Sequence, residues 1–373
     1  MKKVIAVLSN DHMWTFNLRK EILISLLEQG YRVVLVLPYG ERVDDLIKLG
    51  CEFVDIKSMN RHSMNPINEI KLFFEYKKIL KSIKPDVVLT YTIKPNIYGG
   101  IVCRFLKIPM IANVTGLGSS LQGGIQSVIM TFLYKIGLKK ADTVFFQNQE
   151  NMNFMVKKHL VKDNFDLLPG SGVDLSTHCA EVYPDETDEM IFVTIGRVMK
   201  DKGIQELLIA AKEIKKRYPK VRFQLIGAHD GNCEAMVEQA ESEGYIEYLG
   251  LQKNVHEFIK KAYATIHASH HEGMANVLLE SAATARPIIA SNIPGCTETF
   301  DEGITGMGFE VENSVELINV IEKFILLPHA QKEKMGRLGR KKMEREFDRN
   351  IVVCKYLYAV KNILGDDKQY VTL

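Results

Sequence analysis

Short apolar runs alternate with helical patterns along the first half of the chain. The run from Val4 to Leu8 is continuous and apolar, which is typical of a strand that is covered on both faces of a parallel sheet. Residues 16–28 then place leucine and isoleucine at helical spacing. The alternation continues with expected strands at 32–37, 53–56, 87–89, 110–114 and 143–146 and expected helices at 67–82, 98–105 and 125–139. Strand and helix in strict turn predict an α/β fold with an open parallel sheet.

A second α/β region follows a polar connection. Residues 177–188 contain Pro184 and several acids, so they are interpreted as a linker. Beyond them the pattern restarts, with expected strands at 190–195 and 222–226 and an expected helix at 204–217. The chain has 373 residues, too many for one ordinary core, and therefore suits two domains.

Composition narrows the class of protein. Hydrophobic residues make up 46% of the chain and charged residues 25%, which are globular values, and the net charge of +2 does not indicate a nucleic-acid partner. The six cysteines form no Cys-x-x-Cys pair, which argues against a zinc site and a disulfide framework and favours a reducing compartment. The first apolar run stops at Ser9, too early for a signal peptide, and no apolar run reaches about 18 residues, so any membrane contact should be peripheral.

An anion site is predicted in the second half. Residues 263–268 read as a buried strand, Gly273 interrupts the pattern, and residues 276–285 read as a helix. The first N–H groups of a helix have no partner inside it, so phosphate is a natural guest there. Glu272 and Glu280 flank this point, about 12 Å apart along a helix. They would repel a diphosphate unless they address neutral, hydroxyl-bearing ends, as a sugar nucleotide provides.

A second loop offers positive charge to the same ligand. Arg197 and Lys202 lie between glycines, after an expected strand and before an expected helix. Arginine presents a planar fork to phosphate oxygens, and lysine presents a mobile charge. His267, His270 and His271 cluster nearby, but with no cysteine or aspartate to complete a ligand set they are interpreted as core and loop histidines.

Three segments together resemble the signature of glycosyltransferase family 4. They are Glu272-Gly273, residues 280–290 and Gly295-Cys296-Thr297-Glu298. Ser281 and Ala285 are mild departures from the pattern. The resemblance implies the GT-B fold, with two facing Rossmann-like domains. We expect an acceptor-binding domain at 1–175, a nucleotide-sugar-binding domain at 176–350, and a C-terminal helix in 351–373 that crosses back to the first domain.

The resemblance also implies roles for the donor-site residues. Arg197 and Lys202 would supply two cations to the donor diphosphate, Glu272 would contact the hydroxyls of the donor sugar, Glu280 would hold the ribose, and Val255 would face the nucleobase. Arg197, Lys202 and Glu272 are therefore the expected catalytic residues. The full expected donor site comprises Gly196, Arg197, Lys202, Val255, Glu272, Gly273, Met274, Ala275 and Glu280. No metal and no other cofactor is implied, because the cations and the helix N-terminus take that place.

The expected acceptor site lies in the first half. Ligands of open parallel sheets sit beyond the carboxyl ends of the strands, and residues 91–100 and 114–119 are loops at such ends. Both resemble loops of N-acetylgalactosaminyltransferases that extend glycans on undecaprenyl diphosphate. Many family members carry a catalytic histidine near the second of these loops, where this chain has Thr115 and Gly116. Residues 9–17 form a third expected loop. The expected acceptor-binding residues are Asn17, Lys94, Asn96, Thr115, Gly116 and Gly118.

The resulting hypothesis is a retaining glycosyltransferase. It would move a sugar, with an N-acetylhexosamine of the N-acetylgalactosamine type as the best guess, from a UDP-sugar to a lipid-diphosphate-linked saccharide in the assembly of a bacterial surface polysaccharide or glycoprotein glycan. The expected place is the cytoplasm, at the inner face of the membrane. Residues 117–140 are apolar with lysines at their end, which fits either a membrane-surface helix or a core helix. A sugar-nucleotide epimerase and a non-catalytic sugar-nucleotide-binding partner are the alternatives.

Overall fold

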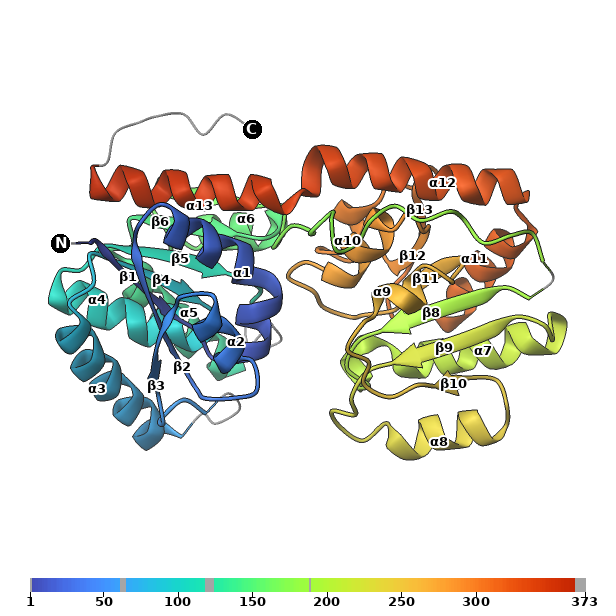
Figure 1. Ribbon diagram of the computed structural model, residues 1–373. Coiled ribbons are helices and arrows are strands. Elements are labelled where there is room, and N and C mark those ends of the chain that lie inside the picture. Colours follow the sequence, from blue (N-terminus) through green and yellow to red (C-terminus); the bar gives the residue numbers. More distant parts are fainter. Residues whose placement is uncertain (1, 61–64, 118–123, 188, 366–373) are drawn as a thin grey trace. The chain divides into compact units, whose positions relative to one another are not determined.

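Two compact units make up the protein, and each is described by itself. The computed structural model describes residues 2–60, 65–117, 124–187 and 189–365 (Figure 1). The N-terminal unit comprises Met1–Gly172 and Arg349–Leu373, and the C-terminal unit comprises Val173–Asp348. The chain therefore changes unit after Gly172 and again after Asp348, near the expected boundaries at residues 175 and 350.

The N-terminal unit contains a seven-stranded parallel sheet in the order β3-β2-β1-β4-β5-β6-β7. Its strands are β1 Val4–Leu8, β2 Arg32–Leu37, β3 Glu52–Asp55, β4 Val87–Tyr91, β5 Met110–Val114, β6 Thr143–Phe146 and β7 Phe165–Leu167. Its helices are α1 His12–Glu28, α2 Val43–Lys48, α3 Pro66–Ile83, the π-helical turn η1 Pro95–Gly99, α4 Gly100–Leu106, α5 Gly124–Leu138, α6 Gln149–Lys157 and α13 Arg349–Leu364.

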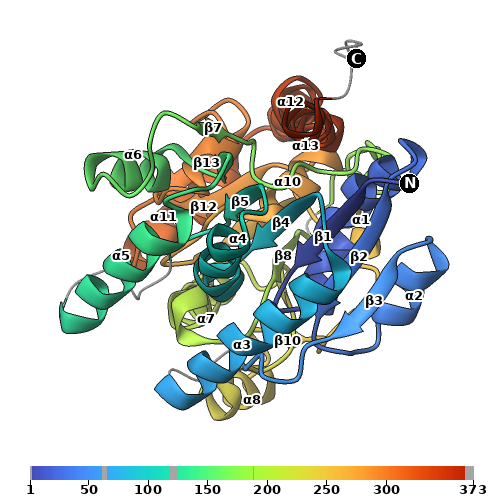
Figure 2. The same ribbon diagram turned by 90° about the vertical axis from the view of Figure 1, so that its left-hand side faces the viewer.

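Strand alternation divides the core of this unit between the two faces of the sheet. Ile5 and Val7 of β1 pack in a cluster with residues of α1 and α13, whereas Ala6 and Leu8 pack in a cluster with residues of α3, α4 and α5. Helices therefore cover both faces, as a parallel sheet requires. Figure 2 shows the helices α3 and α4 beside this sheet. No helix in the described part of the chain has the length and the hydropathy that crossing a bilayer requires.

Helix α1 begins earlier than the sequence pattern suggested. The side chain of Asp11 caps it by accepting a hydrogen bond from the backbone N–H of Trp14 at 2.9 Å. Residues 12–15 are therefore helical, although they were expected to lie in the loop that precedes the helix predicted from residue 16. Asn17 lies on α1 and is exposed, so it belongs to a rigid element.

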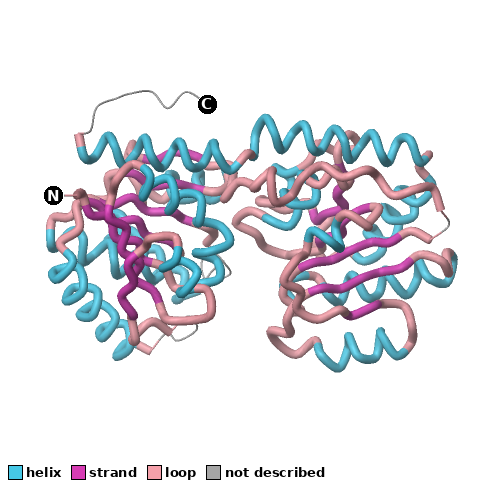
Figure 3. The backbone as a smooth tube through the Cα atoms, in the orientation of Figure 1, coloured by secondary structure: helices cyan, strands magenta, loops and turns pink. Residues whose placement is uncertain are grey.

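The C-terminal unit contains a six-stranded parallel sheet in the order β10-β9-β8-β11-β12-β13. Its strands are β8 Ile191–Ile195, β9 Arg222–Ile226, β10 Glu247–Tyr248, β11 Ala264–His267, β12 Ile288–Ser291 and β13 Gly306–Phe309. Its helices are α7 Ile204–Arg217, α8 Glu234–Ser242, α9 His256–Ile259, α10 Asn276–Ala283, α11 Ser314–Leu326 and α12 His329–Lys342, with the shorter helical turns η3 Lys200–Lys202, η4 Thr297–Thr299 and η5 Met343–Phe347. Figure 3 shows helices and strands alternating along this unit.

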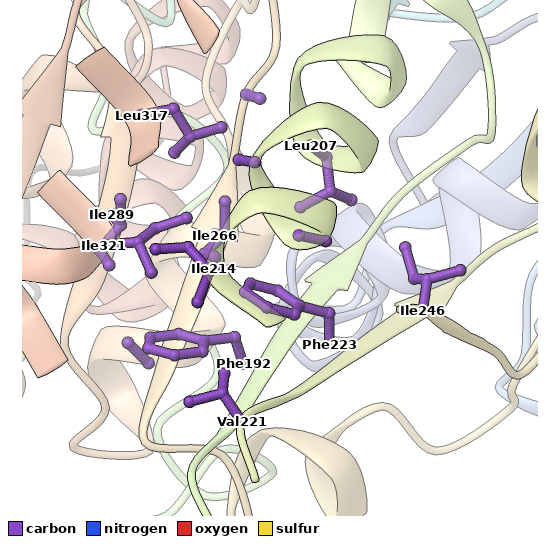
Figure 4. Packing of buried hydrophobic residues seen from close by; sticks show 14 of the residues in the cluster. Phe192, Leu207, Ile214, Val221, Phe223, Ile246, Ile266, Ile289, Leu317 and Ile321 are labelled. Atoms are coloured by element: carbon purple, nitrogen blue, oxygen red, sulfur yellow. The ribbon is translucent and has the colours of Figure 1, made fainter. Parts of the chain in front are cut away.

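Aromatic and branched side chains fill the core of the C-terminal unit between its sheet and the helices α7 and α11. Phe192 of β8 stacks on Phe223 of β9 with ring centroids 5.5 Å apart. Ile214 of α7 and Ile321 of α11 contribute to the same buried cluster (Figure 4). This packing fixes β8 and β11, the two neighbouring strands whose carboxyl ends carry the site described next.

Candidate functional site

Two loops at the carboxyl ends of β8 and β11 are packed against each other. Gly203 ends the turn η3 with φ +66°, and a Cβ built on it would lie 2.0 Å from the carbonyl oxygen of Ala268. Only glycine fits such an approach without displacing the backbone. The backbone N–H of His270 also donates to the carbonyl oxygen of Asp201 at 2.9 Å. These contacts set Lys202, on η3, beside the loop that follows β11.

Lys202 forms a shielded ion pair with Glu272 within that arrangement. The Lys202 Nζ lies 2.5 Å from Glu272 Oε1, and the side chains are only 19% and 13% exposed. The same carboxylate oxygen accepts a hydrogen bond from His267 Nε2 at 2.8 Å. Burial alone would raise the pKa of Glu272, but the His267 hydrogen bond and the Lys202 charge lower it to about 2. Glu272 is therefore a carboxylate at neutral pH.

The loop after β12 packs against the backbone of Glu272 and Gly273. Gly295 has φ +82°, and a Cβ there would lie 2.9 Å from the carbonyl oxygen of Gly273 and 3.0 Å from Glu272 Cβ. The carbonyl oxygen of Gly295 accepts from the Ala275 N–H at 2.8 Å, and its N–H donates to Glu298 Oε2 at 2.7 Å. Gly295 and Glu298 of the Gly-x-x-Glu pattern thus hold the loop that contains Glu272 in place. Ala275 was expected in the donor site, but its N–H donates to Gly295.

Helix α10 begins directly after this loop. Met274 and Ala275, which precede it, are buried. Ser281 is held by a 2.7 Å hydrogen bond between its Oγ and Thr265 Oγ1, which ties the helix to β11. This contact explains the serine at a position where the signature has alanine. Glu280 lies on the same helix and is half-buried.

Arg197 has a different partner from Lys202. Its Nη1 lies 2.5 Å from Asp230 Oδ2, in a pair whose side chains are 41% and 44% exposed. Val255 is half-buried and immediately precedes α9. The structure thus joins Lys202 to Glu272 and joins Arg197 to Asp230. Sequence reasoning did not assign His267 or Asp230 to the site. The place of His267 at the end of β11, five residues before Glu272, was the one available signal.

Two residues expected to bind the acceptor have structural partners in the N-terminal unit. Lys94 Nζ lies 2.5 Å from Glu69 Oε1 and donates to the carbonyl oxygen of Asn60 at 2.7 Å. Asn96 is fully buried, and its amide links Thr90 Oγ1 at 2.7 Å to the carbonyl oxygen of Asn113 at 2.8 Å.

The remaining acceptor candidates are placed at the carboxyl end of β5 and beyond. Thr115 and Gly116 follow β5 directly and are half-buried, with Gly116 at φ 159°. Gly118 lies outside the described residues. The acceptor site stays a prediction, in which Asn17 is exposed, Lys94 is held in an ion pair and the Asn96 amide is used inside the fold.

Two family descriptions match the chain. The description "Glycosyl transferases group 1" matches residues 180–342. The description "Glycosyl transferase 4-like" matches residues 3–148. Each match falls within one unit, and together they cover most of the chain.

Two similar proteins come from bacteria. The chain is 25% identical to the N,N'-diacetylbacillosaminyl-diphospho-undecaprenol alpha-1,3-N-acetylgalactosaminyltransferase of Campylobacter jejuni, over 96% of this chain and 99% of that protein. It is also 25% identical to the capsular polysaccharide biosynthesis glycosyltransferase CapM of Staphylococcus aureus, over 76% of this chain and 80% of that protein.

Solved structures share the whole architecture. A glycosyltransferase from Rickettsia africae superposes with a TM-score of 0.78 at 18% identity, covering 98% of this chain and 100% of that one. HepE from Anabaena, solved in complex with UDP and glucose, superposes with a TM-score of 0.78 at 15% identity, covering 96% of this chain and 99% of that one. The fold is thus GT-B, as the sequence resemblance predicted.

Proposed function

We propose, from the premise that the chain is a glycosyltransferase, that it transfers a sugar from a UDP-sugar to a lipid-diphosphate-linked saccharide with retention of the anomeric configuration. An N-acetylhexosamine of the N-acetylgalactosamine type is the proposed sugar. The proposed pathway is the assembly of a bacterial surface polysaccharide or glycoprotein glycan. The name of the Campylobacter relative supports this choice of sugar and acceptor, and the UDP-bound HepE supports the choice of donor.

The pairing of Lys202 with Glu272 is the observation that carries the proposal. Negative charge develops on the leaving diphosphate as the anomeric bond breaks, and cations already in place lower that barrier. A lysine ammonium has three N–H donors, so Lys202 can hold Glu272 with one and a phosphate oxygen with another. Arg197 would supply the second charge once it releases the exposed Asp230, a pair worth little in water.

The remaining donor contacts follow from the same placement. Glu272 is ionised and can accept hydrogen bonds from sugar hydroxyls, while Glu280 would hold the ribose and Val255 would face the base. The backbone amides of Gly273 and Met274, in the loop just before α10, would add donors to the diphosphate. Gly196 would let the Arg197 loop approach it closely. The leaving phosphate would take the acceptor proton, and no metal is part of the proposal.

A peripheral membrane contact is proposed through α5. Val128, Ile129 and Phe132 are 70%, 50% and 62% exposed on this helix, whereas Met130 and Tyr134 point into the core. Exposed lysines follow at positions 135, 139 and 140. An apolar face beside basic residues suits the surface of an anionic bilayer. Such a contact would bring the enzyme to a lipid-linked acceptor at the inner face of the cytoplasmic membrane.

A transfer assay tests the proposal. The purified full chain is incubated with UDP-N-acetylgalactosamine, UDP-N-acetylglucosamine or UDP-glucose and an undecaprenyl-diphosphate-linked saccharide. We expect a product lengthened by one sugar, with the anomeric configuration of the donor by NMR. The Arg197→Ala, Lys202→Ala double variant should lose at least about 100-fold in kcat/KM, since removal of one preorganised donor costs about 10²–10³. Lys212→Ala, which breaks an exposed ion pair, is the matched control.

The same assay separates the alternatives. An epimerase would convert the UDP-sugar to an isomer without any acceptor, which the donor-only reaction detects. A non-catalytic binding partner would give no transfer, or transfer that Glu272→Ala leaves unchanged. Full activity of the Arg197→Ala, Lys202→Ala double variant would contradict the assigned donor site even if transfer itself is observed.

A further inference from the structure

We propose that Cys179, Glu181 and His256 form a binding site for a divalent zinc-like ion in the C-terminal unit, independent of the proposed transfer reaction. Cys179 and Glu181 lie in the connection before β8, and His256 is the first residue of α9. One ligand atom from each residue lies within 4.8 Å of the others. Thiolate, carboxylate and imidazole are the donor set that zinc prefers.

The spacing of the three atoms matches one tetrahedral ion. His256 Nε2 lies 3.1 Å from Glu181 Oε1, Cys179 Sγ lies 3.6 Å from Glu181 Oε1, and Cys179 Sγ lies 3.9 Å from His256 Nε2. Zinc bonds of about 2.0–2.1 Å to nitrogen, about 2.0–2.2 Å to oxygen and about 2.3 Å to sulfur place tetrahedral ligand atoms about 3.3–3.6 Å apart. The atoms therefore need to move only a few tenths of an ångström. Cys179 is exposed, so an ion and a fourth ligand, water, can reach the site.

A hydrogen-bond chain can orient His256 Nε2 toward the proposed ion. Thr284 Oγ1 donates its proton to the carbonyl oxygen of Glu280 at 2.8 Å. Its oxygen can then accept from His256 Nδ1 at 3.3 Å, which leaves Nε2 able to bind a metal. Without an ion, the Cys179 thiol donates to Glu181 Oε1 at 3.6 Å. With the ion bound, this sulfur would lose its proton, and sulfur, carboxylate oxygen and Nε2 would all offer lone pairs to the metal.

The backbone around Glu181 is held in place before any ion arrives. The fully buried guanidinium of Arg286 donates from Nη1 to the carbonyl oxygen of Glu181 at 3.1 Å and from Nη2 to that of Val182 at 2.7 Å. The Glu181 N–H donates to the carbonyl oxygen of Thr284 at 3.3 Å. The His256 ring and the Glu181 backbone are therefore fastened to the end of α10, and binding would order the side chains of Glu181 and Cys179.

A proton on His256 would compete with a metal ion for the site. A protonated His256 would form an ion pair with Glu181 and would need no metal. The thiol distinguishes the two cases, because Cys179 becomes a thiolate ligand of a metal, whereas beside the ion pair it is a thiol that donates a hydrogen bond to Glu181.

Cobalt and zinc binding to the untagged full chain tests the site under a mild reductant. Co²⁺ is the first ion used, since a thiolate–cobalt bond gives a charge-transfer absorption band. We expect one ion per chain with this band, displacement by Zn²⁺, and a rise of about 5–10 °C in the melting temperature at a zinc concentration 100-fold above Kd. Cys179→Ser should abolish the band and weaken binding by at least about 10-fold. Cys354→Ser changes the other cysteine that is not buried and should leave both unchanged.

Two results would overturn the inference. One is wild-type protein that binds no Co²⁺ or binds it without the thiolate band. The other is a Cys179→Ser variant that binds as the wild type does, which would move the ion elsewhere. Glu181→Gln keeps the size of the side chain and should also weaken binding, so the conclusion does not depend on one variant. UDP-sugar transfer is not read out in this experiment, and failure here leaves the proposed function unaffected.

Discussion

Replacing Lys202 with alanine should destabilise the C-terminal unit by about 3 kcal/mol at pH 7. The change leaves the carboxylate of Glu272 shielded from water with only His267 as a partner. Removing one member of a buried pair costs about 3–5 kcal/mol. The lowered pKa of Glu272 has the same sign, but the His267 hydrogen bond contributes to it as well as Lys202, so the lower end of this range is expected.

Hydrogen exchange read by mass spectrometry measures this loss in the unit concerned. Peptides covering β11 and α10 should exchange faster in the Lys202→Ala variant, whereas the exchange of peptides from the N-terminal unit serves as an internal reference. Lys212→Ala is the matched control, because Lys212 pairs with Glu243 at a similar distance of 2.6 Å but with side chains 44% and 36% exposed. That variant should lose less than about 1 kcal/mol.

The stabilisation that ionised Glu272 gives to the fold should depend on pH. A carboxyl whose folded pKa is depressed stabilises the fold above its unfolded pKa and loses that contribution as pH falls through the folded value. For Glu272 the contribution is complete above about pH 4.5 and declines toward about pH 2. The Lys202→Ala variant should lose part of this dependence. A variant as stable as the Lys212→Ala control at pH 7 would refute the argument, as would a Lys202→Ala, Glu272→Gln double variant whose losses simply add.

Two further predictions concern packing and membrane contact. Gly203→Ala should lower the free energy of unfolding by several kcal/mol, because its Cβ would lie 2.0 Å from the Ala268 oxygen. Gly244 is also in the left-handed region but has open space around it, so Gly244→Ala should cost about 1 kcal/mol. Equal losses in thermal unfolding would contradict the packing argument. Phe132→Glu should reduce sedimentation with anionic phospholipid vesicles several-fold, and Leu326→Glu, a similarly exposed residue of α11, should not.

Five strands were predictable to the residue from local pattern, whereas β7 and β13 were not expected. β1, β2, β5, β6 and β9 begin and end at the expected residues, because continuous apolar runs bounded by polar residues fix a strand that is buried on both faces. The start of α1 was missed, since Asp11 was not recognised as an N-cap. The confirmed parallel α/β architecture therefore rested on hydrophobic periodicity, and the error arose where a single polar side chain sets the boundary.

The partners of the charged residues were not predictable in this way. Arg197 and Asp230 are 33 positions apart, and Lys94 and Glu69 are 25 apart. Cys179 and His256 are 77 positions apart, so the absence of a Cys-x-x-Cys pair could not reveal their approach. Such contacts depend on which strand ends become neighbours in the folded sheet. Motif spacing made Lys202 and Glu272 candidates for the donor site but did not predict that they touch.

The scaffold around Glu272 is easier to explain by function than by stability. A buried ion pair contributes little compared with an apolar pair of the same size, and an unpaired buried carboxylate is costly. Yet Gly203 and Gly295 both adopt backbone conformations that bring neighbouring loops against this residue, and His267 donates to it from the adjoining strand. A protein under selection for stability alone would gain by filling this point with an apolar side chain. The retained charge therefore favours a ligand that needs an ionised oxygen at the start of α10.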